Sequence, residues 1–289
     1  MTVIWKSAGG REAVLGRYRQ LLAGWPGGGE PRRIATAQGE TFVISSGPSG
    51  APDVVLLHGS AANAASWMAD AAILARRFRV HAVDMIGEPG LSAPARPPLA
   101  SHVYADWLGE VLAGLGVERA ALVGISLGGW LALEFATRRP ETVSAVVLLC
   151  PGGVGRHRNV LIWALPLLFL GRWGRRKILE RMAGGQAMAP DQASPEAQAY
   201  GEFIDLVFAN FRPRTEALPP FSDAELSRLA MPLLAILGAR DVMIDSAGTR
   251  DRLVRNVPKA EVAWLPQAGH LLIGHGAEID AFLARALGP

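Results

Sequence analysis

The sequence has little cysteine, no long apolar run and a small net charge, and each of these features excludes a class of protein. With Cys150 as the one cysteine among 289 residues, neither an internal disulfide framework nor a cysteine-based zinc site can form. The longest apolar run, 160–170, has 11 residues and contains Pro166, whereas a helix that spans a bilayer needs about 20. A net charge of +3 does not by itself indicate nucleic-acid binding.

The overall composition is that of a globular protein. Apolar residues make up 50% of the chain and charged residues 19%, which excludes a disordered chain. The length allows one large domain or two small ones. Residues 1–25 lack the uninterrupted apolar stretch and cleavage site of a secretory signal peptide, so a cytoplasmic location is expected.

The spacing of apolar residues predicts an α/β fold with a mostly parallel central sheet flanked by helices. Residues 10–24 have the pattern of an amphipathic helix, expected on the main body, and 32–37 with 40–46 resemble the arms of a hairpin. Short apolar runs then alternate with helical patterns, as in the strands and crossover helices of a parallel sheet. The expected strands are 54–57, 79–83, 120–123, 145–149, 233–237 and 261–265, and the expected helices are 66–77, 101–115, 127–138, 246–256 and 276–287.

Residues 152–220 interrupt this pattern with helical segments and no convincing strand. Because structureless loops of this length are uncommon in compact domains, we predict a helical cap inserted into a core formed by 1–151 and 221–289. Within it, 152–185 hold seven basic residues and one acidic residue, a balance of +6 that leaves −3 for the rest of the chain. The apolar run would pack on the body, line an acyl pocket or, with the basic residues, make weak contact with an anionic lipid surface.

The strongest chemical signal is Gly124-Ile-Ser-Leu-Gly128, a G-x-S-x-G sequence between a predicted strand and a predicted helix. In that setting the motif forms a nucleophile elbow. Its glycines allow strand and helix to approach closely, and its serine takes a strained backbone conformation that exposes the hydroxyl. Ser126 is therefore the predicted nucleophile.

A serine hydroxyl is a poor nucleophile near neutral pH and needs an imidazole base, which a carboxylate must orient. Asp241 and His270 each follow a predicted strand and complete the triad in a chain order that catalytic triads adopt. His275 is the rival base. The histidine that ends an earlier strand, His58, is expected to stabilise a tight turn, and Asp84 to organise another.

The turn that starts at His58 also predicts an oxyanion hole. Backbone N–H groups of such a turn point over the carboxyl edge of the sheet, where they can bind an oxyanion with the N–H of the residue after the nucleophile. The candidates are Ser60 and Leu127. For substrate contact the candidates are Trp130, close behind the elbow, and Trp163 in the cap.

Together these motifs resemble the α/β-hydrolase superfamily, and within it the small capped serine esterases. The residues that carry the resemblance follow successive strands: His58-Gly59, the turn 84–90, the Ser126 elbow, 238–241 and Gly269-His270. The resemblance implies a carboxylic ester hydrolase that forms an acyl-enzyme without a metal or organic cofactor, with Ser60 and Leu127 as oxyanion donors. We expect a hydrophobic or aromatic ester of small to medium size as substrate, and no nucleic-acid partner.

Differences from related families narrow the range of reactions that we expect. Haloalkane dehalogenases and epoxide hydrolases use an aspartate nucleophile, where this chain has Ser126. Carbon–carbon bond hydrolases usually have asparagine before the serine, where this chain has Ile125. Carbon–carbon bond hydrolases and lactonases stay alternatives. A receptor or signalling protein that keeps the triad and turns over slowly is the alternative from a different class.

Overall fold

A computed structural model describes residues 4–158, 161–185 and 195–288 of the chain. Its strands form one sheet in the order β1-β2-β4-β3-β5-β6-β7-β8. The sheet is parallel from β4 to β8, and β2 is antiparallel to both β1 and β4. The strands are β1 (Glu30–Thr36), β2 (Gly39–Ser46), β3 (Asp53–Leu57), β4 (Arg79–Val83), β5 (Ala120–Ile125), β6 (Val143–Leu149), β7 (Leu233–Gly238) and β8 (Ala260–Leu265).

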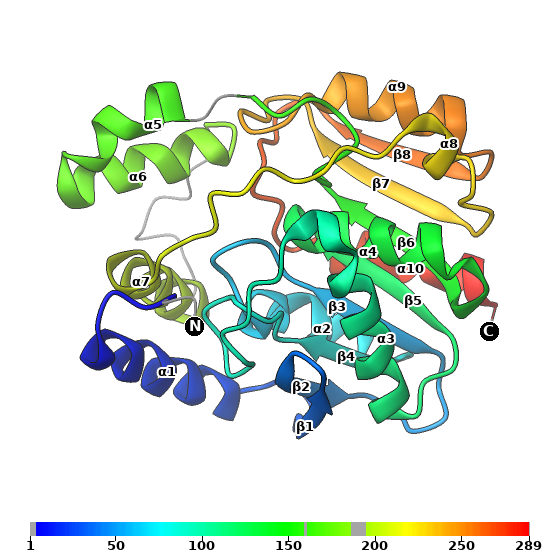
Figure 1. Cartoon of the computed structure of the whole chain (residues 1–289), viewed down its shortest axis with the longest axis horizontal. Helices are drawn as coiled ribbons and strands as arrows, with labels where there is room; N and C mark the ends of the chain where they lie inside the picture. The colour runs from blue at the N-terminus through cyan, green and yellow to red at the C-terminus, as the bar shows by residue number, and fades with distance from the viewer. Residues whose placement is uncertain (1–3, 159–160, 186–194, 289) are drawn as a thin grey trace.

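Helices cover both faces of this sheet (Figure 1). On one face lie α3, α4 and α9, and on the other α2 and α10. The longer helices are α1 (Ala8–Ala23), α2 (Met68–Leu74), α3 (Val103–Leu115), α4 (Leu127–Arg138), α5 (Leu161–Leu168), α6 (Gly171–Met182), α7 (Pro195–Asn210), α9 (Ser246–Asn256) and α10 (Gly276–Leu287). Shorter turns are η1 (Ala64–Trp67), η2 (Leu99–Ser101), η3 (Pro140–Thr142) and α8 (Asp223–Leu226).

Successive residues of the central strands alternate between two hydrophobic cores. Val55 and Leu57 of β3 face α3 and α4, whereas Val54 and Leu56 face α2 and α10. All four are completely buried, which stabilises the fold by about 1.5–3 kcal/mol for each side chain. This two-sided burial is why the central strands are continuous apolar runs in the sequence.

The structure confirms the predicted fold class and each of the predicted strands to within three residues. The helix expected at 66–77 is instead the short turn η1 followed by α2, which ends at Leu74. The chain turns there because the N–H groups of Arg77 and Phe78 both donate to the carbonyl of Leu74. The spacing of apolar residues does not reveal this turn, because Phe78 is buried just as it would be in a continuous helix.

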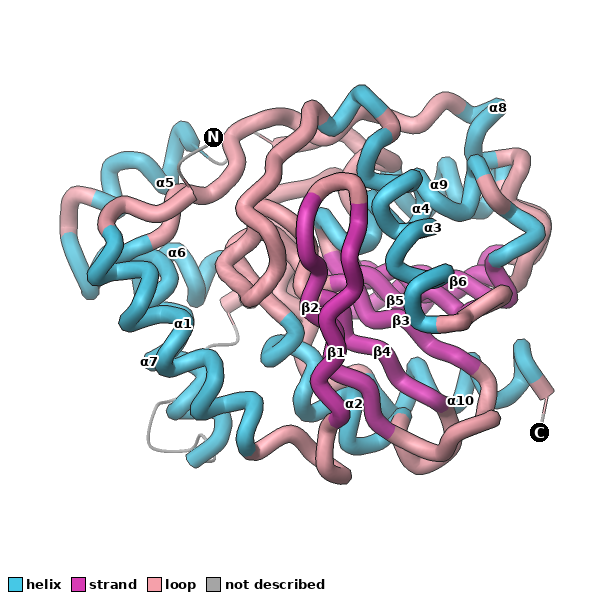
Figure 2. Tube along the Cα trace, turned by 60° about the horizontal axis from the view of Figure 1, so that its bottom comes forward, coloured by secondary structure: helices cyan, strands magenta, loops and turns pink. Residues whose placement is uncertain are grey.

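Helix α1 packs chiefly along α7, whereas the sequence placed it on the main body. The two helices lie side by side in Figure 2. Tyr18 of α1 stacks on Phe203 of α7 with ring centroids 6.0 Å apart. Trp5 also meets Phe211 edge to face, at 5.6 Å between centroids. The apolar stripe of α1 predicts that this helix packs against another apolar surface, but it does not identify that surface.

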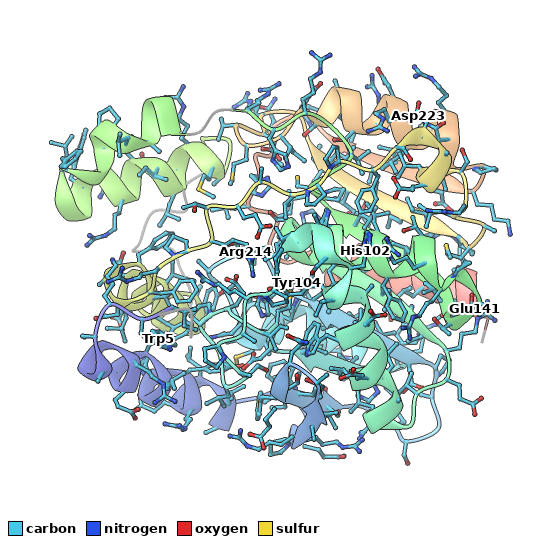
Figure 3. The ribbon with its side chains drawn as sticks, in the orientation of Figure 1. Trp5, His102, Tyr104, Glu141, Arg214 and Asp223 are labelled. Atoms are coloured by element: carbon cyan, nitrogen blue, oxygen red, sulfur yellow. The ribbon has the colours of Figure 1, made fainter. Side chains whose placement is uncertain are left out.

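The helices α5, α6, α7 and the short α8 lie between β6 and β7, and the described part of this segment contains no strand. The chain returning from α7 is held to the core where Arg214 donates to the hydroxyl of Tyr104 on α3 (Figure 3). Division of the chain into a core and a separate cap at 152–220 stays a prediction. Within the described residues no helix is both long enough and apolar enough to cross a membrane.

We predict that the contact between α1 and α7 makes a large contribution to stability. Truncating the fully buried Phe203 with Phe203→Ala should lower the free energy of unfolding by about 3–5 kcal/mol, because it removes the ring and leaves a cavity. Urea denaturation measures the change. The matched control on the same helix is Phe208→Ala, whose side chain is 36% exposed and whose loss should cost below about 1 kcal/mol. Equal losses in both variants would contradict the prediction.

Candidate active site

Ser126 occupies a strained turn between β5 and α4. Its backbone has φ 53° and ψ −109°, a conformation that costs a non-glycine residue free energy and that clusters at functional sites. The turn requires glycine on both sides. A Cβ at Gly124 would lie 2.3 Å from the carbonyl oxygen of Gly128, and one at Gly128 would lie 2.1 Å from that of Leu57. The motif therefore forms the elbow that the sequence predicted.

A chain of two hydrogen bonds joins the three predicted triad residues. The Oγ of Ser126 lies 2.9 Å from Nε2 of His270, and Nδ1 of the same ring lies 2.7 Å from Oδ2 of Asp241. An ionised Asp241 selects the tautomer with the proton on Nδ1, which leaves Nε2 free to accept the serine proton. The arrangement can thus activate Ser126 as a nucleophile.

The surroundings of Asp241 favour its ionised form. Burial acts most strongly and raises the pKa of this carboxyl, but hydrogen bonding and charge from His270 oppose it, and the net pKa lies below the usual value. The second oxygen, Oδ1, accepts backbone N–H groups of Met243 and Ile244 at 2.7 and 3.0 Å. These two bonds also fix the carboxylate plane toward the imidazole.

The predicted oxyanion donors lie on either side of the nucleophile. Leu127 is the first residue of α4 and directly follows Ser126. A Cβ built at Gly59 would lie 3.7 Å from Cβ of Ser126, so the turn that carries the Ser60 N–H runs beside the serine. Within the described part of the chain, neither the N–H of Ser60 nor that of Leu127 donates to another protein group. Both can bind an oxygen of a substrate.

His58 stabilises the turn, as the sequence predicted. Its ring is completely buried, donates from Nδ1 to the carbonyl of Gly59 at 2.8 Å and accepts the N–H of Met85 at Nε2 at 2.9 Å. Burial lowers the pKa of His58 to about 4, so the ring is neutral near pH 7. It joins the turn after β3 to the turn after β4.

A buried carboxylate that the sequence analysis did not single out holds the same turn. Oε2 of Glu88 accepts the N–H of Ala61 at 2.6 Å, and Ala61 has a positive φ of 58°. Asp84, also buried, accepts the N–H of Ala64 at 2.9 Å and the hydroxyl of Tyr18 at 2.7 Å. Burial raises the pKa of Asp84 to about 6 and that of Glu88 to about 7. Oδ2 of Asp84 accepts the N–H of Leu91 at 2.7 Å, so Asp84 organises its turn as predicted, whereas the role of Glu88 required the fold.

The segment between β6 and β7 contacts the loop that carries the base. The carbonyl of Met182, at the end of α6, accepts the N–H groups of His270 and Leu271 at 2.6 and 3.1 Å. A Cβ at Gly269 would lie 2.2 Å from that same carbonyl oxygen, so only glycine permits the approach. The position of α6 therefore helps to fix the position of His270. No sequence signal marked Met182 for this role.

The other candidates lie outside this hydrogen-bonded group. Trp130 is 1% exposed and donates from Nε1 to the carbonyl of Pro219 at 3.0 Å, so it packs in the core, and its contact with substrate stays a prediction. Trp163 is in α5, and its side chain lies outside the described residues. The rival base His275 is paired with Glu278 at the start of α10, 3.1 Å away, and Ser126 is bonded to His270 instead.

Cys150 is close enough to the triad for a metal site to be considered. Its Sγ and the ligand atoms of Asp241 and His270 lie within 4.8 Å of one another. Burial raises the pKa of the Cys150 thiol well above its usual value, which disfavours the thiolate that a metal requires. Both other side chains already bond to each other. The donor set therefore suits the triad better than a metal.

Comparison with known proteins agrees with this geometry. Residues 54–282 match the alpha/beta hydrolase family. Carboxylesterase YbfK of Bacillus subtilis is 31% identical over 258 residues, which cover 88% of this chain and 86% of that protein. The crystal structure of that carboxylesterase, also called CesB, covers 97% of this chain and 99% of its own, with a TM-score of 0.81 and 27% identity.

A second solved structure, naproxen esterase (carboxylesterase NP) of B. subtilis, matches with a TM-score of 0.80 and 29% identity. It covers 94% of this chain and 96% of its own. The chain belongs to the alpha/beta hydrolase family. These relatives support the prediction of a carboxylic ester hydrolase.

We predict that Glu88 makes the stability of the protein depend on pH. A carboxyl whose pKa is higher in the folded chain than in the unfolded chain stabilises the fold while protonated, and this contribution is lost as the pH rises through the folded pKa. For Glu88 the loss falls between the usual pKa of 4.5 and about 7. Glu88→Gln keeps an oxygen that accepts the Ala61 N–H and removes the titration. Over that range the wild type should lose on the order of 3 kcal/mol relative to this variant.

Urea denaturation of both proteins between pH 4.5 and pH 8 measures the difference in the free energy of unfolding. Asp84 titrates in both proteins, so its contribution cancels from that difference. The control is Glu12→Gln, because the Glu12 side chain is 65% exposed. That variant should follow the wild type at every pH. Parallel curves for wild type and Glu88→Gln would show that Glu88 titrates normally.

Proposed function

We propose that this protein is a serine hydrolase that cleaves a carboxylic ester through an acyl-enzyme, with Ser126 as nucleophile, His270 as base and Asp241 as the residue that orients the base. The observation that carries the proposal is the continuous hydrogen-bonded chain from Ser126 through His270 to Asp241. The strained elbow adds support, because it presents the hydroxyl at the carboxyl edge of the sheet.

In the first half of the reaction, Nε2 of His270 takes the proton of Ser126 as Oγ attacks the ester carbonyl. The carbonyl oxygen gains negative charge, which the N–H groups of Ser60 and Leu127 stabilise. His270 then donates its proton to the departing alcohol, and the acyl group stays on Oγ. Asp241 stabilises the imidazolium while it exists.

In the second half, water replaces the alcohol. His270 accepts a proton from the water, which attacks the acyl carbon, and the same two N–H groups hold the oxyanion. Collapse of the intermediate returns the proton to Ser126 and releases the acid. Every proton moves between Oγ, Nε2 and the reactants, so these steps need no cofactor.

The proposed substrate is a hydrophobic or aromatic ester of small to medium size. Support comes from the related structure that is named naproxen esterase. A lactone or a carbon–carbon bond would use the same triad, but Ile125 stands where the carbon–carbon hydrolases usually have asparagine. A cytoplasmic site of action stays a prediction from the sequence.

We predict that a fluorophosphonate reacts with Ser126 alone. Intact mass spectrometry should show one adduct on the wild type and none on Ser126→Ala, because only a serine activated by its base attacks the phosphorus. The control Ser101→Ala, at a serine outside the triad, should be labelled like the wild type. Ester turnover by Ser126→Ala should fall by about 10⁴ to 10⁶-fold. An adduct on Ser126→Ala would move the nucleophile to another residue.

We also predict that kcat/KM for aryl esters rises with the length of an unbranched acyl chain until the site is filled. Each buried methylene contributes about 0.8 kcal/mol, or about fourfold in kcat/KM. Steady-state kinetics on a series of 4-nitrophenyl esters measures the slope, and a hemisuccinate ester of similar length is the charged control. Faster cleavage of short polar or charged esters would contradict the proposed substrate class.

A further inference from the structure

Exposed large apolar side chains gather at one place in this protein. Across the described ranges seven such side chains are exposed, and four of them lie within 165–173. Phe169 is 84% exposed, and the other three are 52–54% exposed. We call these four residues the apolar tip: Leu165, Phe169, Leu170 and Trp173. With 84% of its side chain exposed, Phe169 does not line a buried acyl pocket.

The apolar tip stands away from the sheet. Helices α5 and α6 pack against each other and project from the body as a pair (Figure 1). Phe169 and Leu170 form the turn between the two helices, at the end of the pair far from the sheet. The opposite end of α6 is the one that contacts the His270 loop, through Met182. The apolar tip can therefore contact another surface without covering the core of the protein.

Positive charge surrounds the tip. Residues 161–182 contain five basic residues and one acidic residue, Glu180. Arg176 and Lys177 follow the tip on α6 with side chains 63% and 41% exposed, and both pair with that single acid. Arg175 also lies 3.9 Å from a carboxylate oxygen of Asp205 on α7. Arg176 and Lys177 share the single carboxylate of Glu180, so this exposed pair next to the apolar tip keeps a net positive charge.

These two features together select an anionic lipid surface over other partners. Apolar side chains flanked by basic ones are typical of segments that lie in the interface of a membrane, where the apolar groups insert and the basic groups meet lipid phosphates. A second copy of this chain would bring an equally positive surface against the first, and like charges would oppose that contact. A neutral apolar partner would leave the basic residues without a role.

We propose that the α5–α6 pair docks this protein on anionic lipid membranes, with the apolar tip inserted at the interface and Arg176 and Lys177 among the headgroups. The docking is peripheral. It goes beyond ester hydrolysis and does not depend on that activity.

The test is co-sedimentation of the full chain with vesicles. One set is pure phosphatidylcholine and the other contains about 30% phosphatidylglycerol, which gives the surface a negative potential. We expect the wild type to bind the anionic vesicles at least about tenfold more tightly, and to lose binding in high salt because salt screens the attraction.

Two double variants separate the apolar and charged contributions. Phe169→Ser with Trp173→Ser removes apolar area, and Arg176→Gln with Lys177→Gln removes two charges. Each pair should weaken binding by about tenfold or more. The matched control changes one exposed apolar residue and one exposed basic residue on α9, with Val254→Ser and Arg255→Gln. This control should bind like the wild type. Thermal melting confirms that each variant is folded.

Several results would overturn the proposal. Failure of the wild type to bind anionic vesicles would do so, as would equal binding to both vesicle types or equal losses in the tip variants and the α9 control. Light scattering measures the oligomeric state, which gives a further test. If the wild type is a dimer and the tip variants are monomers, the tip is a contact between copies rather than a lipid anchor. Because these measurements record binding and oligomeric state and not turnover of the phospholipid esters, their failure leaves the proposed hydrolase activity untouched.

Discussion

The turn at Ser126 is the constraint on which the rest of the site depends. A serine held at φ 53° is unfavourable by itself and persists only because its neighbours leave the backbone no alternative. Glycine at 124 and 128 lets α4 approach β5 and the carbonyl of Leu57 at distances that any side chain would block. The turn also sits where the strand order reverses, between β3 and β5, at which crevices form in open parallel sheets.

Around this turn, the protein uses buried polar groups to hold two loops together. His58 accepts the N–H of Met85, Glu88 accepts that of Ala61, and Asp84 accepts that of Ala64. Two carboxyls are thus kept in a place where burial raises their pKa, at a cost to stability above neutral pH. What they stabilise is the orientation of the backbone beside Ser60. Such groups are retained in a core when a fixed geometry matters more than maximal stability.

The helices between β6 and β7 connect the active site to the outside of the molecule. At its C-terminal end α6 contacts the backbone of His270 through Met182, and at its N-terminal end it bears exposed aromatic and basic side chains. Helix α7 is meanwhile held by α1, which also reaches Asp84 through Tyr18. Helix α1 therefore links α7 to the loops beside Ser126.

Much of this protein follows from local sequence. The strands buried on both faces appear as continuous apolar runs, and the elbow, Asp241 and His270 appear at strand ends, because periodicity and glycine spacing are properties of short segments. Other features depend on residues far apart in the chain: the stacking of Tyr18 on Phe203, the bond from Ala61 to Glu88, and the contact of Met182 with His270. The hydrogen bond from the indole of Trp130 to the carbonyl of Pro219 is a further contact of this kind. A helical pattern predicts that one face of the helix is buried, and the end of a predicted strand indicates where a side chain can reach the edge of the sheet. Which partner meets that face or that side chain was decided only when the tertiary structure brought distant segments together, because burial and hydrogen bonding are satisfied in space and not along the sequence.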